Sequence, residues 1–407
     1  MQVDLKGKSI LLGVTGSISA YKACDIARLF VKAGASVHMV MTASSERFVS
    51  ALTFEALTRN PVLTDSSESW SSDLNHIDIG KKCDLFLIAP CSANTINKLS
   101  QGIADNILTQ TALAFTKEIL IAPAANTYML SNHATLKSLH YLRDNHVTII
   151  TPQKKLLACG DVGSGALAEP SEVFYAAART LLKESFWENR QAVVTGGGSR
   201  EKVDEVRYIS NFSSGKMAKS LCLALYLKGA NVSYITSMGS EGLPLDIKRT
   251  NFEDADALLK NTQEALNIAK TNTQEEPYLF MVAAVADFKP KSPKKGKLKK
   301  STLGESWSVE LTQNPDVLSS LKRDGVKTVG FKAEMDSKEG LNNAVKLLTQ
   351  KSVDAVCYNL LKDAKSFGGD ENEITFITHN TQTSLGRADK LSLSFSILTQ
   401  AKELASE

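Results

Sequence analysis

The segment 207–220 combines residue types that could bind a phosphate group. Ser213, Ser214, Gly215 and Lys216 directly precede an apolar helical pattern. The start of a helix has unpaired backbone N–H groups and a partial positive charge, and hydroxyls and a lysine would add to its attraction for an anion. The same residues could simply cap the helix, but Arg207 lies just upstream and favours a phosphate site beyond the midpoint of this 407-residue chain.

Four segments in the first half carry small, polar or thiol side chains at the ends of strand-like runs or among glycines. They are residues 16–18, 89–95, 122–129 and 158–165, and His76 stands before the third strand-like run. A turn such as 16–18 can hold a phosphate on its backbone N–H groups, although a plain tight turn has the same composition. A histidine is suited to proton transfer near neutral pH, although most histidines in such a place have no chemical role. Together these segments predict a second site that differs from the first.

The elements that would position these segments alternate between strands and helices. Apolar runs predict strands at 9–14, 37–41, 84–90, 119–123 and 147–150, and then at 191–195, 232–236, 279–284, 328–331, 355–358 and 373–377. Apolar strands separated by helices are typical of parallel sheets, which bind ligands beyond the carboxyl ends of their strands. We therefore predict an α/β fold with two Rossmann-like doubly wound domains and mainly parallel sheets. Residues 186–190 would join a domain at 1–186 to one at 187–407.

The composition is that of an ordinary soluble globular protein, with 43% apolar and 22% charged residues. A net charge of +3 is too small to indicate binding to nucleic acid or to a membrane surface. The six cysteines show neither a CxxC pair nor zinc spacing, so we expect reduced, mostly packed thiols. Because we find neither a leader pattern nor an apolar run near the ~20 residues of a membrane span, we expect a cytoplasmic protein.

The segment 289–300 carries seven lysines together with two prolines and a glycine. This composition cannot form a core element and predicts a mobile basic loop. Such a run is often just solvated, and it could also attract RNA. However, no aromatic residues are interleaved with the lysines, and the whole chain lacks a basic excess. We therefore expect no nucleic-acid partner.

The segments of the first half resemble, in this order, the flavin-dependent cysteine decarboxylases, specifically phosphopantothenoylcysteine decarboxylases, over nearly all of residues 5–180. The resemblance implies a flavodoxin-like flavoprotein half. It implies an FMN site made of Gly16, Ser17, Ile18, Thr42, Ser92, Ala93, Asn94 and Thr95. By the same resemblance, His76 would be the base, Asn126 would bind the substrate carboxylate and Cys159 would return a proton.

The chemistry of this reaction explains the need for a flavin. Loss of CO₂ from a cysteine amide leaves a carbanion without an electron sink, whereas prior oxidation of the thiol to a thioaldehyde supplies one. The chain differs from the family at Ala125, where a methionine is usual, and at Ala166 and Leu167, where Arg-Met is usual. The three residues assigned to catalysis are unchanged, so we expect decarboxylation. A flavin-binding half that only scaffolds or regulates is the alternative.

The segment 207–216 and later motifs resemble phosphopantothenate–cysteine ligases over about residues 190–400. The resemblance implies that CTP activates the carboxylate of 4′-phosphopantothenate and that cysteine then displaces CMP. It implies a CTP site made of Asp287, Lys297, Pro315, Asp316, Val317, Leu318, Phe331, Lys346 and Lys351. Asn211 would contact the acyl-cytidylate, with Arg207 beside it. Lysines and Mg²⁺, whose ligands are not assigned, would offset the repulsion between the carboxylate and the triphosphate.

The two halves together predict a bifunctional enzyme of coenzyme A biosynthesis. The second half would make 4′-phosphopantothenoylcysteine and the first half would convert it to 4′-phosphopantetheine. A nicotinamide-dependent reductase is a further alternative, but neither first turn carries GxGxxG followed by an acidic residue. The resemblance also implies a homo-oligomer, with trimers of the flavin half and dimers of the ligase half.

Overall fold

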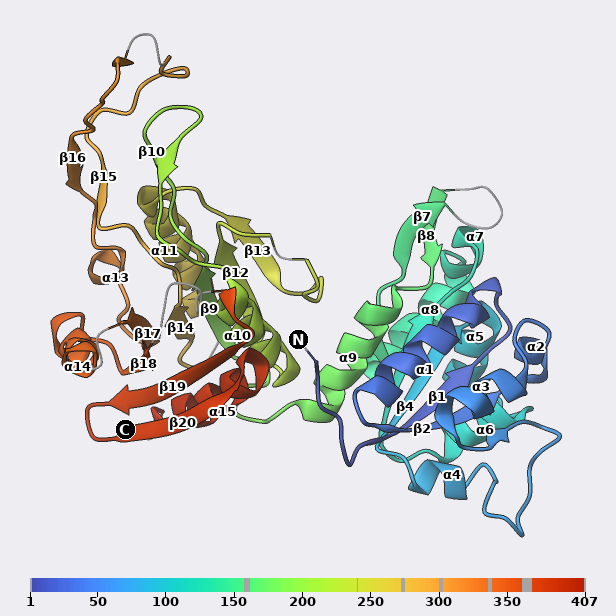
Figure 1. Cartoon of the computed structure of the whole chain (residues 1–407). Helices are drawn as coiled ribbons and strands as arrows, with labels where there is room; N and C mark the ends of the chain where they lie inside the picture. Colours follow the sequence, from blue (N-terminus) through green and yellow to red (C-terminus); the bar gives the residue numbers. More distant parts are fainter. Residues whose placement is uncertain are drawn as a thin grey trace. The chain divides into compact units, whose positions relative to one another are not determined.

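The chain folds into two compact units, Gln2–Leu182 and Lys183–Glu407 (Figure 1). This computed structural model describes residues 2–156, 162–239, 241–271, 275–299, 303–335, 339–360 and 368–405. The two units are described one after the other.

The first unit is built on a six-stranded parallel sheet. Its strands are β1 (Ser9–Val14), β2 (Ser36–Met41), β3 (Val62–Leu63), β4 (Leu85–Cys91), β5 (Glu118–Pro123) and β6 (Thr148–Ile149). Their order is β3-β2-β1-β4-β5-β6, so the direction of winding reverses between β1 and β4. All seven residues of β4 are buried, which explains its unbroken apolar sequence. Ligands of such sheets bind at this reversal, outside the carboxyl ends of the strands.

Helices and one hairpin complete the first unit. The helices are η1 (Ile18–Tyr21), α1 (Lys22–Lys32), α2 (Ala43–Glu46), α3 (Ala51–Thr58), α4 (Asp78–Lys81), α5 (Ala93–Gln101), α6 (Ile107–Ala114), α7 (Thr127–Leu130), α8 (His133–Asp144) and α9 (Pro170–Leu182). Helix α1 packs against α3 and α9, and the rings of Phe30 and Phe174 meet there at 5.1 Å between centroids. Helix α5 packs against α6 and α8. The hairpin of β7 (Gln153–Leu156) and β8 (Val162–Ala166) is antiparallel.

The second unit contains an eight-stranded, mainly parallel sheet. Its strands are β9 (Gln191–Gly196), β12 (Asn231–Thr236), β13 (Lys248–Asn251), β14 (Tyr278–Met281), β17 (Lys327–Glu334), β18 (Ala355–Leu360), β19 (Glu371–Thr378) and β20 (Gln382–Asp389). The order is β13-β12-β9-β14-β17-β18-β19-β20, and β19 alone runs antiparallel to the other strands of this sheet. The predicted α/β fold with mainly parallel, doubly wound sheets is therefore confirmed.

The helices of the second unit position the loops at the strand ends. They include α10 (Lys216–Leu227), α11 (Ala255–Thr271), α13 (Val317–Ser320), α14 (Gly340–Gln350) and α15 (Lys390–Glu403). Helices α10 and α11 both pack on β9, and α10 also packs along α15. The buried hydroxyl of Tyr278 donates to the carbonyl of Ala401 at 3.0 Å, which joins the sheet to α15.

An arm extends from the second unit and holds much of the lysine-rich segment (Figure 1). It is made of β10 (Glu201–Lys202), β11 (Tyr208–Ile209), β15 (Phe288–Pro290) and β16 (Leu311–Gln313). Lys289 bonds Asp256 and Lys291 bonds Glu310, each at 2.6 Å. The prediction of a loop throughout this segment is wrong for its first residues, because strand pairing and ion pairs hold them in β15.

The cysteines of the described ranges are all free thiols. Burial raises the pKa of Cys83 to about 12, and burial also raises the pKa values of Cys91, Cys222 and Cys357. These four thiols are therefore packing groups. In the part of the chain that the structure describes, we find no helix with the length and apolar character needed to cross a membrane.

Candidate active sites

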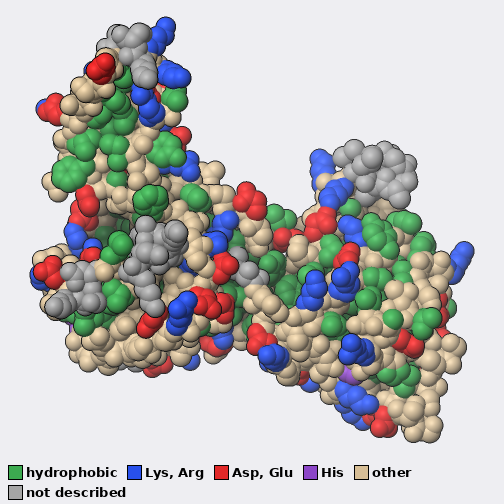
Figure 2. Space-filling view, in the orientation of Figure 1, with side chains coloured by type: hydrophobic (Ala, Val, Ile, Leu, Met, Phe, Trp, Pro, Cys, Tyr) green, Lys and Arg blue, Asp and Glu red, His purple; other side chains and the backbone are tan. Residues whose placement is uncertain are grey.

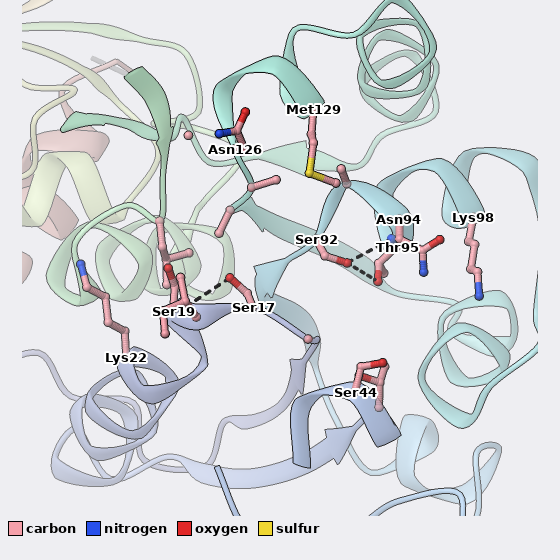
Figure 3. Close-up of a pocket in the computed structure, with 18 of the residues that line it drawn as sticks. Ser17, Ser19, Lys22, Ser44, Ser92, Asn94, Thr95, Lys98, Asn126 and Met129 are labelled. Carbon is pink, nitrogen blue, oxygen red and sulfur yellow. Dashed lines mark hydrogen bonds between the residues drawn. The ribbon is translucent and has the colours of Figure 1, made fainter. Parts of the chain in front are cut away.

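The first unit has a pocket of about 870 Å³ at the carboxyl ends of β1, β2, β4 and β5. Figure 3 shows Ser17, Ser92 and Asn126 around it on three different loops. All eight residues that the sequence predicted for FMN line this pocket, namely Gly16, Ser17, Ile18, Thr42, Ser92, Ala93, Asn94 and Thr95. The reversal in strand order thus brings the separate segments together.

A close approach between loops shapes the floor of this pocket. A Cβ atom on Gly16 would lie 2.6 Å from Cβ of Ser44, so only glycine lets the turns after β1 and β2 come this near. The hydroxyl of Thr15 donates to the carbonyl of Pro90 at 2.8 Å and accepts from the N–H of Ser92 at 2.9 Å. These bonds fix the turn after β1 against the turn after β4.

Two hydroxyls on the pocket wall also cap the helices that follow them. Ser17 Oγ accepts from the N–H of Ser19 at 3.2 Å, and Thr42 Oγ1 accepts from the N–H of Ser45 at 3.3 Å. A capping hydroxyl uses an acceptor lone pair and keeps its O–H for another partner. Both side chains can therefore donate to an anion in the pocket, which suits the phosphate of a flavin nucleotide.

The loop that carries Asn126 is held by the β7–β8 hairpin. The N–H of Ala125 donates to the carbonyl of Gly165 at 3.1 Å. A Cβ atom on Gly165 would lie only 2.0 Å from the carbonyl oxygen of Ala125, so the glycine is needed for this contact. Asn126, Ala125, Ala166 and Leu167 all line the pocket. Cys159 lies outside the described residues.

His76 is not among the residues that line this pocket. Its Nδ1 lies 2.6 Å from Oε1 of Glu68, and its ring forms a T-shaped contact with the ring of Trp70 at 5.6 Å between centroids. Both members of the Glu68–His76 pair are about three-quarters buried. Within one chain, the structure thus brings Asn126 to the flavin residues but leaves His76 in a separate cluster.

Three lysines that line the first pocket, Lys22, Lys98 and Lys155, were missed by sequence reasoning. Lys22 and Lys155 both line it, and both pair with Glu169, Lys22 at 3.7 Å and Lys155 more closely. The hydrogen bond from Lys155, with the nearby charge of Lys22, lowers the pKa of Glu169 despite its partial burial. None of these lysines belongs to a recognisable sequence motif. Lys155 comes to the pocket only through the fold of the β7–β8 hairpin.

The second unit has a pocket of about 640 Å³ at the carboxyl ends of β9, β14, β17 and β18. The predicted phosphate segment lines it through Ser213, Ser214 and Gly215. Asn211 also lines it, and its Nδ2 donates to the carbonyl of Val285 at 2.9 Å. The predicted phosphate loop therefore lies at a pocket, as expected.

Arg207 does not line this pocket but fixes the arm beside it. Its guanidinium bonds the buried carboxylate of Asp204 through Nε at 3.0 Å and Nη2 at 2.5 Å. The carboxylate also accepts the N–H of Leu298 at 3.1 Å. The bond from Arg207, supported by backbone N–H groups, holds the pKa of Asp204 well below its usual range. Arg207 thus ties the β10–β11 strands to the lysine-rich segment.

Asp287 and Phe331 are the predicted CTP residues that line the second pocket. The remaining ones, Lys297, Pro315, Asp316, Val317, Leu318, Lys346 and Lys351, are not among its lining residues. Asp316 caps α13 by accepting from the N–H of Ser319 at 3.0 Å, and it pairs with Lys351. Val317 is buried in the core. The 315–318 turn nevertheless begins next to Asp287, because the N–H of Asn314 donates to the carbonyl of Asp287 at 2.8 Å.

Sequence reasoning missed three polar residues that line the second pocket from the far strands. They are Asn359 on β18, Asn372 on β19 and Lys390 at the start of α15. Asn372 ends the 367–372 sequence motif of the ligase resemblance but was given no role, whereas Asn359 and Lys390 stand in no motif. Strand β20, which precedes α15, has a largely polar sequence that gave no strand signal. No group of three or more metal-ligating His, Cys, Asp or Glu side chains occurs among the residues described.

The fold and the two pockets define a two-domain α/β protein with a separate ligand site at the strand ends of each sheet. Residues 1–182 match the family model described as Flavoprotein, and residues 187–404 match the DNA/pantothenate metabolism flavoprotein C-terminal domain.

The chain is 36% identical over 414 aligned residues to the coenzyme A biosynthesis bifunctional protein CoaBC of Bacillus subtilis (strain 168), covering 99% of this chain and 98% of that protein. It is 33% identical over 407 residues to the protein of that name from Haemophilus influenzae, with 98% of each covered. A solved structure of a PPC decarboxylase mutant complexed with pantothenoylaminoethenethiol is 36% identical, with a TM-score of 0.39, covering 42% of this chain and 96% of that one.

The chain therefore belongs to the family of coenzyme A biosynthesis bifunctional proteins. The family predicted from the sequence is confirmed, and with it the prediction of a bifunctional enzyme of coenzyme A biosynthesis.

Proposed function

We propose that the second unit activates 4′-phosphopantothenate with CTP and couples it to cysteine, and that the first unit decarboxylates the product with FMN. The observation that carries this proposal is the pair of separate pockets, each at the strand ends of its own sheet. Relatives named as bifunctional proteins of coenzyme A biosynthesis match across both units, which supports it. The division of labour follows the predicted domains, 1–186 for decarboxylation and 187–407 for ligation.

The first pocket suits FMN in its size and in the groups on its wall. Ser17 and Thr42 would donate to the phosphate, and Gly16 lets the turns that carry these two residues come close together. When bound, FMN supplies the reversible two-electron chemistry that lets a thiol be oxidised before CO₂ is lost. Asn126 would orient the substrate carboxylate as a neutral donor. It would stabilise the carboxylate charge less than an arginine, so it would oppose less strongly the release of neutral CO₂, which leaves the electron pair of the C–C bond on the substrate.

His76 needs a second copy of the chain if it acts as the proposed base. It does not line the pocket that holds Asn126, and its ring nitrogen is held by Glu68. The trimer implied by the family resemblance would let His76 of one copy reach the pocket of the next. A mixture of His76→Asn and Asn126→Asp subunits, each inactive alone, should then regain part of the decarboxylase activity. No recovery after exchange of subunits would contradict this assembly.

The second pocket suits a nucleotide that meets an acyl substrate. Asp287 would bind the ribose hydroxyls, Phe331 would lie against the base, and Asn211 would contact the acyl-cytidylate. Carboxylate attack on the α-phosphate brings two anions together, so cations are required. We propose that Lys297, Lys346 and Lys351 approach the triphosphate with Mg²⁺, and that phosphate replaces the carboxylate of Asp316 on Lys351.

The arm of the second unit offers a surface for pairing two copies of the ligase half. Figure 2 shows hydrophobic side chains along the part of the arm that carries β15 and β16. Tyr208, Phe288 and Leu311 are 54%, 52% and 43% exposed. Large apolar side chains gathered on one surface are typical of an interaction site. We propose that this surface takes part in the dimer implied by the resemblance.

A cytoplasmic location stays a prediction from the sequence.

An assay with different combinations of substrates tests this function directly. Purified protein is incubated with 4′-phosphopantothenate, cysteine and one nucleoside triphosphate at a time, while pyrophosphate and CO₂ are followed. We expect pyrophosphate with CTP, and CO₂ after it. ATP working as well as CTP would overturn the base assignment. Pyrophosphate without CO₂ would favour the alternative in which the flavin half is a scaffold.

A further inference from the structure

Two long helices of the second unit begin beside each other, and both begin with a lysine. Helix α10 starts at Lys216 and α15 starts at Lys390, and the two helices pack together (Figure 1). Nζ of Lys216 donates to the carbonyl of Gly368 at 2.8 Å and to Asp370 Oδ1 at 2.6 Å. Nζ of Lys390 donates to the carbonyl of Gly369. Two ammonium groups, one of them at the uncapped start of α10, therefore converge on the segment 368–370.

Lys390 differs from Lys216 in its burial and in its position on the pocket wall. Lys390 is 6% exposed and lines the second pocket. Among the described residues, no carboxylate lies within ion-pair distance of Lys390. Asp370 is the nearby acid, but its side chain is 88% exposed and is paired with Lys216. Burial, with the charge of Lys216, lowers the pKa of Lys390.

A buried ammonium group held mainly by a carbonyl is costly, because most of its hydration has been lost. Packing alone does not require a charge at this position, since a methionine has a similar length and would fill the same space. Asp370 and Asp389 balance the charges of the two lysines, and Asp389 caps the start of α15 by accepting from the N–H groups of Leu391 and Ser392. The start of α10 has no side-chain cap, so its partial positive charge adds to the buried ammonium of Lys390. The end of the pocket between α10 and α15 is thus built to attract an anion.

We infer that Lys390 binds a phosphate group of a ligand in the second pocket, with residues 213–215 at the start of α10 as neighbouring contacts. This inference rests on the proposed ligase function. That function offers two sources of phosphate, the triphosphate of CTP and the phosphomonoester of 4′-phosphopantothenate. The bound phosphate would take over from the carbonyl of Gly369 as the main partner of Nζ.

The test compares ligand affinities of the full chain by calorimetry. Lys390→Met is measured with CTP, cytidine, 4′-phosphopantothenate and pantothenate. We expect about a tenfold or larger loss of affinity for one phosphorylated ligand, since a charge-assisted hydrogen bond is lost. The affinity for the corresponding ligand without phosphate should stay unchanged. A loss of affinity for CTP would identify the triphosphate as the partner of Lys390. A loss of affinity for 4′-phosphopantothenate would identify the phosphomonoester instead.

Lys402→Met is the matched control, because Lys402 is an exposed lysine on the same helix. It should bind every ligand as the wild-type protein does, and Lys390→Arg should restore part of the lost affinity. Binding of both phosphorylated ligands by Lys390→Met with wild-type affinity would overturn the assignment of Lys390. If the wild-type protein bound neither CTP nor 4′-phosphopantothenate, the proposed ligase function, on which this inference rests, would be overturned instead.

Discussion

Oε1 of Glu68 lies 2.6 Å from Nδ1 of His76 and 3.4 Å from its backbone N–H. A carboxylate in this position keeps a proton on Nδ1, which leaves Nε2 as the nitrogen that can accept a proton. The Trp70 ring, nearly perpendicular to the imidazole, restricts it from another side. Glu68 is therefore a positioning residue for His76, although no sequence motif marks it.

Replacement of Glu68 by glutamine should impair decarboxylation without changing the fold. Loss of a charge-assisted hydrogen bond, about 1.5–3 kcal/mol, would lower kcat by about 10- to 100-fold, with KM little changed. Nitrogen NMR of His76 should show a shift from the Nδ1–H tautomer to a mixture. Glu55→Gln, at an exposed site on α3, is the control. An unchanged tautomer in Glu68→Gln would refute the positioning role.

Gly16→Ala should weaken FMN binding. The new Cβ atom would lie 2.6 Å from Cβ of Ser44, so the turns after β1 and β2 must separate. Overpacking of this kind costs about 1–3 kcal/mol, which corresponds to about a tenfold or larger loss of flavin affinity. Flavin absorbance retained after gel filtration measures the effect, and circular dichroism checks the fold. Wild-type flavin content would show that this contact does not shape the flavin site.

Gly165→Ala should separate flavin binding from catalysis. Its Cβ atom would lie 2.0 Å from the carbonyl oxygen of Ala125 and would displace the loop that carries Asn126. We expect FMN to remain bound while decarboxylation of added 4′-phosphopantothenoylcysteine falls by about tenfold or more. The measurement is the rate of CO₂ release per bound flavin. A normal rate per flavin would mean that the hairpin does not position Asn126.

Asp204→Asn should destabilise the second unit at neutral pH. The folded protein holds the pKa of Asp204 below its usual range, so the unfolded chain binds this proton more readily. The carboxylate therefore stabilises the fold above the unfolded pKa of about 4, and this contribution is lost as pH falls toward the folded pKa. Melting at pH 7 should occur at least about 2–4 °C lower in the variant. A difference that does not shrink below pH 4 would contradict this role.

Thiol labelling should distinguish packed cysteines from reactive ones. Burial raises the pKa values of Cys83, Cys91, Cys222 and Cys357, so each stays a thiol at pH 8. Iodoacetamide should leave these four unmodified in the native protein and should label them after denaturation, as peptide mass spectrometry would show. Rapid native labelling of any of the four would mean that its surroundings open in solution.

The fold could be predicted where burial imposes a pattern on the sequence. Strands such as β4, with every residue buried, are continuous apolar runs and were found within one or two residues. Strand β13 was missed because all four of its residues are exposed at the sheet edge, and β20 because it is largely polar. Edge strands need no apolar face, so periodicity does not reveal them.

The sites could be predicted where residues directly follow a strand of the sheet. Asn126 and the flavin residues do so, and the strand ends carry them to one pocket. The pairing of Lys351 with Asp316 and the position of His76 depend on loops that sequence spacing does not fix. Lys390 was missed for the same reason, because only the folded sheet brings α15 to the second pocket.

The central claim is that each pocket performs one of two consecutive reactions, and two variants of a single chain test it. Asn126→Asp should convert 4′-phosphopantothenate, cysteine and CTP into 4′-phosphopantothenoylcysteine and pyrophosphate without releasing CO₂. Asn211→Asp should form no 4′-phosphopantothenoylcysteine, yet it should release CO₂ at the wild-type rate when that compound is supplied. Loss of both reactions in either correctly folded variant would contradict two independent sites.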